Sequence, residues 1–115
     1  MDIQEKIRQI VNETPVILFM KGTPTFPQCG FSASACALLK TCHADFTTVN
    51  VLEDPEIRQG IKVFANWPTI PQLYIHGEFI GGADIMKEMY QSGELQTSLA
   101  AVSTSYASRP ANAKE

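Results

Sequence analysis

The sequence has no long hydrophobic stretch, no excess of positive charge and too few cysteines for a disulfide framework. Its longest uninterrupted apolar runs, such as Val16–Met20, have five residues, whereas a helix needs roughly 20 to span a bilayer. The formal net charge of −3 offers no general attraction to nucleic acid or anionic lipid. These absences predict a protein that binds neither nucleic acid nor a membrane.

The cysteine count and the N-terminal residues predict a reducing, cytoplasmic environment. The chain has three cysteines, and an odd number argues against a framework of disulfides. The N-terminal residues include charges of both signs at Asp2, Glu5, Lys6 and Arg8. They leave no apolar core for a secretory signal, and a transit peptide avoids such acidic residues.

Length and composition indicate one compact domain, because the chain has 115 residues of which 44% are hydrophobic. We expect this domain to cover residues 1–102. Residues 103–115 are polar and aperiodic, and they are expected to form a flexible C-terminal tail.

Hydrophobic periodicity predicts an α/β protein. Helices are expected across Ile3–Glu13, Cys29–Cys42, Pro55–Phe64, Asp84–Gln91 and Leu95–Val102, and strands across Val16–Met20, Phe46–Val51, Gln72–Ile75 and Phe79–Ile80. A βαβ unit followed by a hairpin indicates a four-stranded mixed sheet flanked by helices on both faces.

Cys29 is the candidate reactive residue because it stands where a Gly- and Pro-containing loop meets the start of a helix. The unpaired N–H groups and the positive dipole end of a first helical turn favour a thiolate over a thiol. Lys21, at the end of the preceding strand, could add a positive charge nearby. The inner face of this helix is expected to contain Phe31, Ala35, Leu38, Leu39 and Cys42.

The other two cysteines are interpreted as packing or surface thiols. Along one helix, Cys36 would lie about 10 Å beyond Cys29, and Cys42 about 9 Å beyond Cys36. A disulfide needs Cα atoms within about 7 Å of each other. The residue three positions after Cys29 is Ser32, which cannot resolve a mixed disulfide, so a redox cycle would need a second thiol from outside the chain.

Four ordered motifs, which span most of residues 3–102, resemble those of the monothiol glutaredoxins. The motifs are Cys29-Gly30-Phe31-Ser32, the CGFS signature of that family, with Met20-Lys21-Gly22-Thr23-Pro24 before it and Trp67-Pro68-Thr69-Ile70-Pro71 and Gly81-Gly82-Ala83-Asp84 after it. The length and layout are similar to those of the bacterial single-domain branch. The resemblance implies a thioredoxin-like fold with a glutathione groove beside Cys29.

The resemblance also implies roles for individual residues toward glutathione. Lys21, Arg58 and Lys62 would face its glycine carboxylate, and the backbone of Ile70 would pair with its cysteinyl unit. Ala83 and Asp84 would hold its γ-glutamyl end, while Pro71 would be the family's cis-proline. Many family members have cysteine where this chain has Ala83. Alanine cannot form a disulfide with Cys29, so that reaction is not possible in this chain.

Without the resemblance, the sequence also allows simpler interpretations of several of these residues. Arg58 and Lys62 could be an ordinary solvated pair, and Gly81-Gly82 could be a turn as readily as a backbone nest for a carboxylate. Trp67 is expected to pack behind the proline turn. The two histidines, His43 and His76, match no family function and are expected at the surface.

The single thiol of Cys29 suggests how an iron–sulfur cluster could be held. A 2Fe–2S cluster needs four ligands, and two chains with two glutathione molecules would supply them, in agreement with the dimer that the resemblance implies. The leading hypothesis is therefore a carrier that delivers clusters to apo-proteins, with BolA-like proteins as further partners. One alternative is a glutathione-dependent oxidoreductase that removes glutathione from mixed disulfides with Cys29 as nucleophile. Another is an interaction module without metal.

Overall fold

The computed structural model describes residues 2–107 and the side chains of residues 2–102. The elements, in chain order, are α1 (Ile3–Glu13), β1 (Val16–Met20), α2 (Gly30–Thr41), β2 (Thr47–Asn50), the short 3₁₀ helix η1 (Val51–Glu53), α3 (Pro55–Ala65), β3 (Gln72–Ile75), β4 (Glu78–Gly81), α4 (Ala83–Ser92) and α5 (Glu94–Ala107). The predicted order of helices and strands is confirmed, with η1 added.

The four strands form one mixed sheet in the order β2-β1-β3-β4. β1 pairs in parallel with β2 and antiparallel with β3, and β3 and β4 form the expected hairpin. Because β1 is an interior strand with all five residues buried, its near-continuous apolar run serves both faces of the sheet. This is the α/β, thioredoxin-like arrangement that the sequence predicts.

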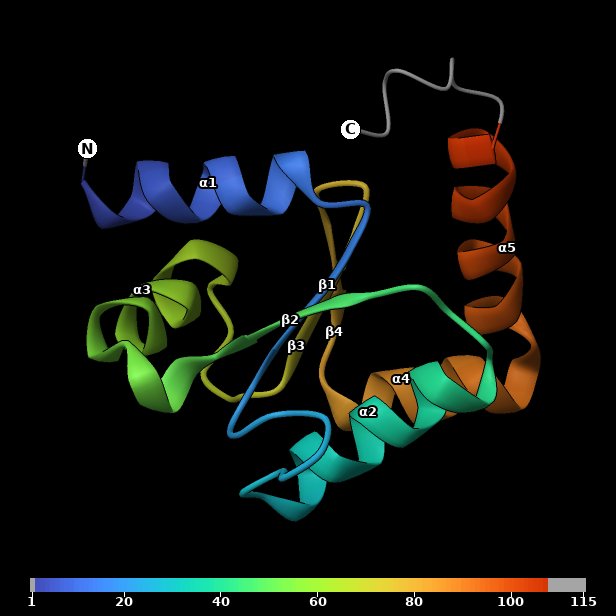
Figure 1. Ribbon diagram of the computed structural model, residues 1–115, viewed down its shortest axis with the longest axis horizontal. Coiled ribbons are helices and arrows are strands. Elements are labelled where there is room, and N and C mark those ends of the chain that lie inside the picture. The colour runs from blue at the N-terminus through green and yellow to red at the C-terminus, as the bar shows by residue number, and fades with distance from the viewer. Residues whose placement is uncertain (1, 108–115) are drawn as a thin grey trace.

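Alternate side chains of β1 contribute to two separate cores, as the twofold period of a strand requires. Ile17 and Phe19 pack with α1 and α3, through residues such as Ile7 and Ile61. Val16, Leu18 and Met20 pack with α2, α4 and α5 on the other face. Figure 1 shows the two groups of helices on opposite sides of the sheet.

Several element ends differ from the expected ones, and for two of them the structure shows a local reason. β2 ends at Asn50 because the Asn50 side chain accepts a hydrogen bond from the Leu52 N–H, at 3.0 Å, and starts η1. α2 begins at Gly30, so Cys29 is its N-cap rather than its first helical residue. Each of these two shifts is one residue, within the usual uncertainty of a helix or strand end.

The prediction that Phe31 belongs to the buried face of its helix is wrong. Its side chain is 64% exposed, whereas Ala35 and Leu39 of the same helix are fully buried. The reason is position, since Phe31 lies in the first turn of α2, where it lines an open pocket with Pro71 and Ala83 instead of the core. Figure 1 shows this end of α2 beyond the ends of the strands.

Within the described part of the chain, none of the helices combines the length and apolarity needed to cross a membrane. The expected tail begins inside α5, which continues to Ala107. Residues 108–115 of that tail lie outside the described residues.

Candidate functional site

The Cys29 thiol lies at the N-terminal end of α2 and is partly exposed to solvent. Cys29 has extended backbone angles, with φ −154° and ψ 136°, and the helix proper starts at Gly30. The thiol makes no capping hydrogen bond, so the N–H groups of the first turn stay available to it. This geometry matches the expectation that Cys29 stands where a loop meets the start of a helix.

The pKa of Cys29 is lowered below its ordinary value, chiefly by the backbone N–H of Ser32. Partial burial of the thiol opposes this shift, while the Phe31 N–H, the Ser32 hydroxyl and the positive charge of Lys21 reinforce it. These donors and this charge stabilise the thiolate and not the thiol. The thiolate is the form of cysteine that acts as a nucleophile or as a soft-metal ligand.

Cys36 and Cys42 differ from Cys29 in the direction of their pKa shifts, and Cys36 is also more deeply buried. All three cysteines are free thiols, which agrees with the spacing argument against a disulfide within this helix. Cys36 is only 2% exposed and packs in the core. Burial raises the pKa of both the Cys36 and the Cys42 thiols, so of the three thiols only that of Cys29 is shifted toward the thiolate.

The loop before Cys29 is closed by backbone hydrogen bonds. The Gln28 N–H donates to the Lys21 carbonyl at 2.9 Å, and the Thr23 N–H donates to the Phe26 carbonyl at 3.2 Å. The Gly22 N–H donates to the Asn50 side chain at 2.9 Å, which ties the loop to the end of β2. The loop therefore holds the backbone leading into Cys29 in one arrangement.

Ser32 joins this loop to the thiol. Its side chain is fully buried, its Oγ accepts a hydrogen bond from the Lys21 N–H at 3.0 Å, and its hydroxyl helps to lower the pKa of Cys29. In addition to leaving Cys29 without a resolving partner, Ser32 thus positions the strand end and stabilises the thiolate.

Ser32→Ala is expected to raise the pKa of Cys29, because one donor to the thiolate is lost while the backbone N–H donors remain. The Lys21 N–H also loses its acceptor, at a cost of about 1–3 kcal/mol of stability. The pKa is obtained from the pH dependence of alkylation at Cys29, followed by peptide mass spectrometry. Ser34→Ala, at an exposed serine of the same helix, is the control, and an equal pKa in both variants would remove Ser32 from this role.

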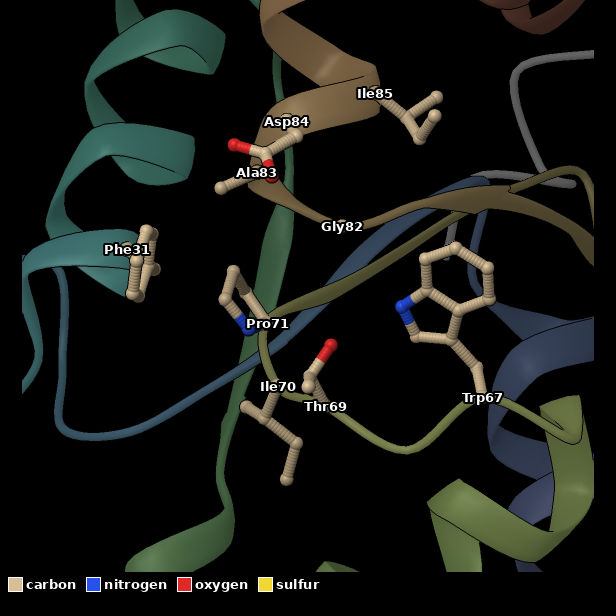
Figure 2. Close-up of a pocket in the computed structure, with 9 residues that line it drawn as sticks. All are labelled: Phe31, Trp67, Thr69, Ile70, Pro71, Gly82, Ala83, Asp84 and Ile85. Atoms are coloured by element: carbon tan, nitrogen blue, oxygen red, sulfur yellow. The ribbon is translucent and has the colours of Figure 1, made fainter.

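A pocket lies beside the start of α2, and three elements supply its walls. It is lined by Phe31 from α2, by Trp67, Thr69, Ile70 and Pro71 from the turn before β3, and by Gly82, Ala83, Asp84 and Ile85 from the start of α4. Figure 2 shows Phe31 across from Pro71, with Asp84 above them. The peptide bond between Ile70 and Pro71 is cis, as the resemblance implies.

Of the six residues predicted to bind glutathione, the structure places Ile70, Ala83 and Asp84 in the pocket wall. Lys21 lies outside the wall but close enough to Cys29 for its charge to lower the pKa of the thiol. Arg58 and Lys62 lie one turn apart on α3 and are partly exposed. The Lys62 carbonyl accepts the Trp67 N–H at 3.0 Å, so α3 ends beside the turn that forms one wall.

The start of α4 presents unpaired backbone donors to this pocket. Gly82 is the N-cap, it has no side chain to cap the helix, and the helical hydrogen bonds begin with the Met86 N–H donating to the Gly82 carbonyl. The N–H groups of the first turn therefore have no partner within the helix. Such an end favours an anionic group.

Sequence reasoning missed the contributions of Phe31, Trp67 and Thr69 to the pocket. Trp67 does pack as expected, with its ring 5.5 Å from that of Phe79, but it also lines the pocket. Its Nε1 is buried without a hydrogen-bond partner. The available signal was the stiff Trp-Pro-Thr-Ile-Pro turn itself, because proline holds such segments open and extended. His43 and His76 are exposed, as predicted.

The chain is similar to known glutaredoxins over most of its length. The sequence model of the glutaredoxin family matches residues 16–80. Glutaredoxin 4 of Haemophilus influenzae (strain 86-028NP) is 49% identical over 107 residues, which cover 93% of this chain and 100% of that protein. A protein of Synechocystis described as a monothiol glutaredoxin ycf64-like is 53% identical over 98 residues, covering 85% of this chain and 92% of that one.

The structure is also similar to those of solved glutaredoxins. The solution structure of reduced poplar apo GrxS14 superposes with a TM-score of 0.76 at 48% sequence identity, covering 89% of this chain and 94% of that one. Together with the single cysteine of the Cys29-Gly30-Phe31-Ser32 motif, these similarities show that the chain belongs to the glutaredoxin family and to its monothiol branch.

Proposed function

We propose that this protein binds glutathione beside Cys29 and carries a 2Fe–2S cluster at the interface of a homodimer for delivery to apo-proteins. The observation that carries the proposal is the Cys29 thiol, which is partly exposed, has a lowered pKa and shares its helix with two thiols of raised pKa. One thiol with a lowered pKa in each chain suits a cluster that is shared between two chains.

The ligand chemistry supports a shared cluster over one held by a single chain. Among the described residues, no group of three or more His, Cys, Asp or Glu side chains is positioned to hold a metal ion. A 2Fe–2S cluster takes four ligands, so Cys29 of two chains and the thiolates of two glutathione molecules would complete the set. The cluster is cargo in this proposal, and the exchangeable glutathione ligands would ease its transfer.

The pocket residues suit the two ends of glutathione. The unpaired N–H groups at the start of α4, including those of Ala83 and Asp84, would receive the γ-glutamyl carboxylate, and the Asp84 carboxylate would meet the ammonium group. The Ile70 backbone would pair with the cysteinyl unit. Lys21, Arg58 and Lys62 would supply positive charge for the glycine carboxylate. The proposal places the protein in the cytoplasm, where thiols are kept reduced, with BolA-like proteins among its partners.

Anaerobic reconstitution with iron and sulfide, with and without glutathione, tests the proposal. We expect visible absorption and a dimer, measured by size-exclusion chromatography with light scattering, only when glutathione is present, because Cys29 alone leaves the ligand set incomplete. A cluster that forms equally well without glutathione, or on a monomer, would contradict the shared arrangement.

The same thiolate also favours a second function, the removal of glutathione from protein mixed disulfides. The Cys29 thiolate would attack the glutathionyl sulfur and release the protein thiol. A glutathione thiolate would then attack the Cys29 mixed disulfide, releasing glutathione disulfide and restoring the Cys29 thiolate. Turnover of a glutathionylated peptide by cluster-free protein measures this activity, and its absence would leave the carrier function alone.

A further inference from the structure

Gln72, the first residue of β3, is a fully buried polar residue whose amide nitrogen and oxygen both have hydrogen-bond partners. Its side-chain amide nitrogen donates to the carbonyl oxygens of Trp67 and Thr69, each at 3.2 Å. Its Oε1 accepts the Tyr74 hydroxyl at 2.9 Å. One side chain thus joins the pocket turn at two points to the strand that follows it.

The orientation of this amide is fixed by its neighbours. Carbonyl oxygens only accept hydrogen bonds, so the NH₂ group has to face Trp67 and Thr69. Burial raises the pKa of Tyr74, which keeps its hydroxyl protonated as the donor to Oε1. Gln72 and Tyr74 are two residues apart on one strand and lie on the same face.

Tyr74 in turn is held by an aromatic cluster. Its ring lies 5.6 Å from that of Phe19 in an edge-to-face contact, 6.0 Å from Phe64 and 5.4 Å from Phe79. The Gln72 amide is therefore anchored to the rigid core on one side and holds the pocket turn on the other.

We propose that Gln72 is a positioning residue for glutathione, which acts by holding the Trp67–Pro71 turn in its binding shape. Three residues of this turn besides Trp67 line the pocket, namely Thr69, Ile70 and Pro71. The inference rests on the proposed glutathione binding, in which the Ile70 backbone pairs with the ligand. A turn fixed in advance avoids the entropy loss of ordering the chain when ligand binds.

The test compares two variants that remove different parts of the network. Gln72→Met keeps the side-chain volume but removes both donors to the turn. Tyr74→Phe keeps the ring in the aromatic cluster and leaves both of those donors in place. We expect Gln72→Met to weaken glutathione binding about tenfold, which corresponds to about 1.4 kcal/mol, and Tyr74→Phe to change it less than about twofold. Calorimetry well below the unfolding temperature of each variant measures the affinity.

Trp67, the only tryptophan in the sequence, reports on the turn without any ligand. Its indole packs against Phe79, and quenching of its fluorescence by acrylamide is expected to increase in Gln72→Met and to stay near the wild-type value in Tyr74→Phe. A role in stability alone would lower the melting temperature of both variants and leave the quenching unchanged. If Gln72→Met does not fold, Gln72→Glu, which offers at most one donor in place of two, takes its place.

The outcomes separate this inference from the proposed function. Wild-type protein that binds no glutathione would contradict the proposed function, while the quenching comparison would still test the hold on the turn. Equal affinities and equal quenching in the wild type and the folded Gln72 variant would overturn the positioning role. Equal weakening by both variants would also overturn it, since the donors to the turn would then not be the cause.

Discussion

Cys29→Ala is expected to abolish the visible absorption and the dimer that form on reconstitution with iron, sulfide and glutathione. Cys29 is the partly exposed thiol whose pKa is lowered by the first turn of α2, and alanine leaves each chain without a sulfur ligand at this position. The residual signal is measured by visible absorption and circular dichroism under anaerobic conditions. Colour retained by Cys29→Ala would show that the ligand has been assigned to the wrong residue.

Cys36→Ser and Cys42→Ser are the matched controls for this loss. Both retain Cys29 and are expected to bind the cluster as the wild type does. Cys36 is buried in the core, so a serine there costs about 1–3 kcal/mol of stability, and folding has to be checked by far-ultraviolet circular dichroism. Loss of the cluster from either folded variant would mean that a second thiol of the same helix takes part.

Gly22→Ala is expected to lower the free energy of unfolding by about 2–5 kcal/mol, the sum of a left-handed backbone penalty and a steric clash. Gly22 has a φ of +95°, and an added methyl group would lie 2.5 Å from the Phe26 carbonyl oxygen and 2.7 Å from the Gln28 nitrogen. Both obstacles are backbone atoms of the loop before Cys29, so the loop has to open. Urea unfolding measures the loss.

Gly93→Ala isolates the conformational part of that effect. Gly93 has a φ of +89°, but an added methyl group meets nothing within 4 Å. Its expected cost is therefore the backbone penalty alone, about 1–2 kcal/mol. Equal losses in the two variants would show that the loop accommodates the methyl group without opening.

Local signals predicted most of the elements and the place of Cys29 at the start of a helix. Asp2 and Asp54 cap α1 and α3, with hydrogen bonds from the Glu5 N–H at 2.9 Å and the Ile57 N–H at 3.1 Å. A change from loop to helical periodicity located Cys29 at a helix start. Such signals act within a few residues of one another, so a sequence displays them directly.

Contacts between distant segments could not be predicted in the same way. The Asn50 side chain accepts a hydrogen bond from the Gly22 N–H, 28 positions away in the sequence. The Ser32 hydroxyl oxygen accepts a hydrogen bond from the Lys21 N–H, just after the end of β1. Phe31 was expected inside because its spacing fits a helical stripe, yet it is 64% exposed and lines the pocket. A periodic pattern identifies the face of a helix, but not where its covering partner ends.

The sequence by itself determined the α/β order, the apolar run of the central strand and a cysteine at a helix start with serine three residues later. Each of these features depends on neighbouring residues. Only the tertiary structure decided that Ile70, Ala83 and Asp84 share one pocket wall with Phe31 and Trp67. It also revealed the hold of Gln72 on the pocket turn. These features depend on strand pairing and helix packing, which bring together groups that the chain itself keeps far apart.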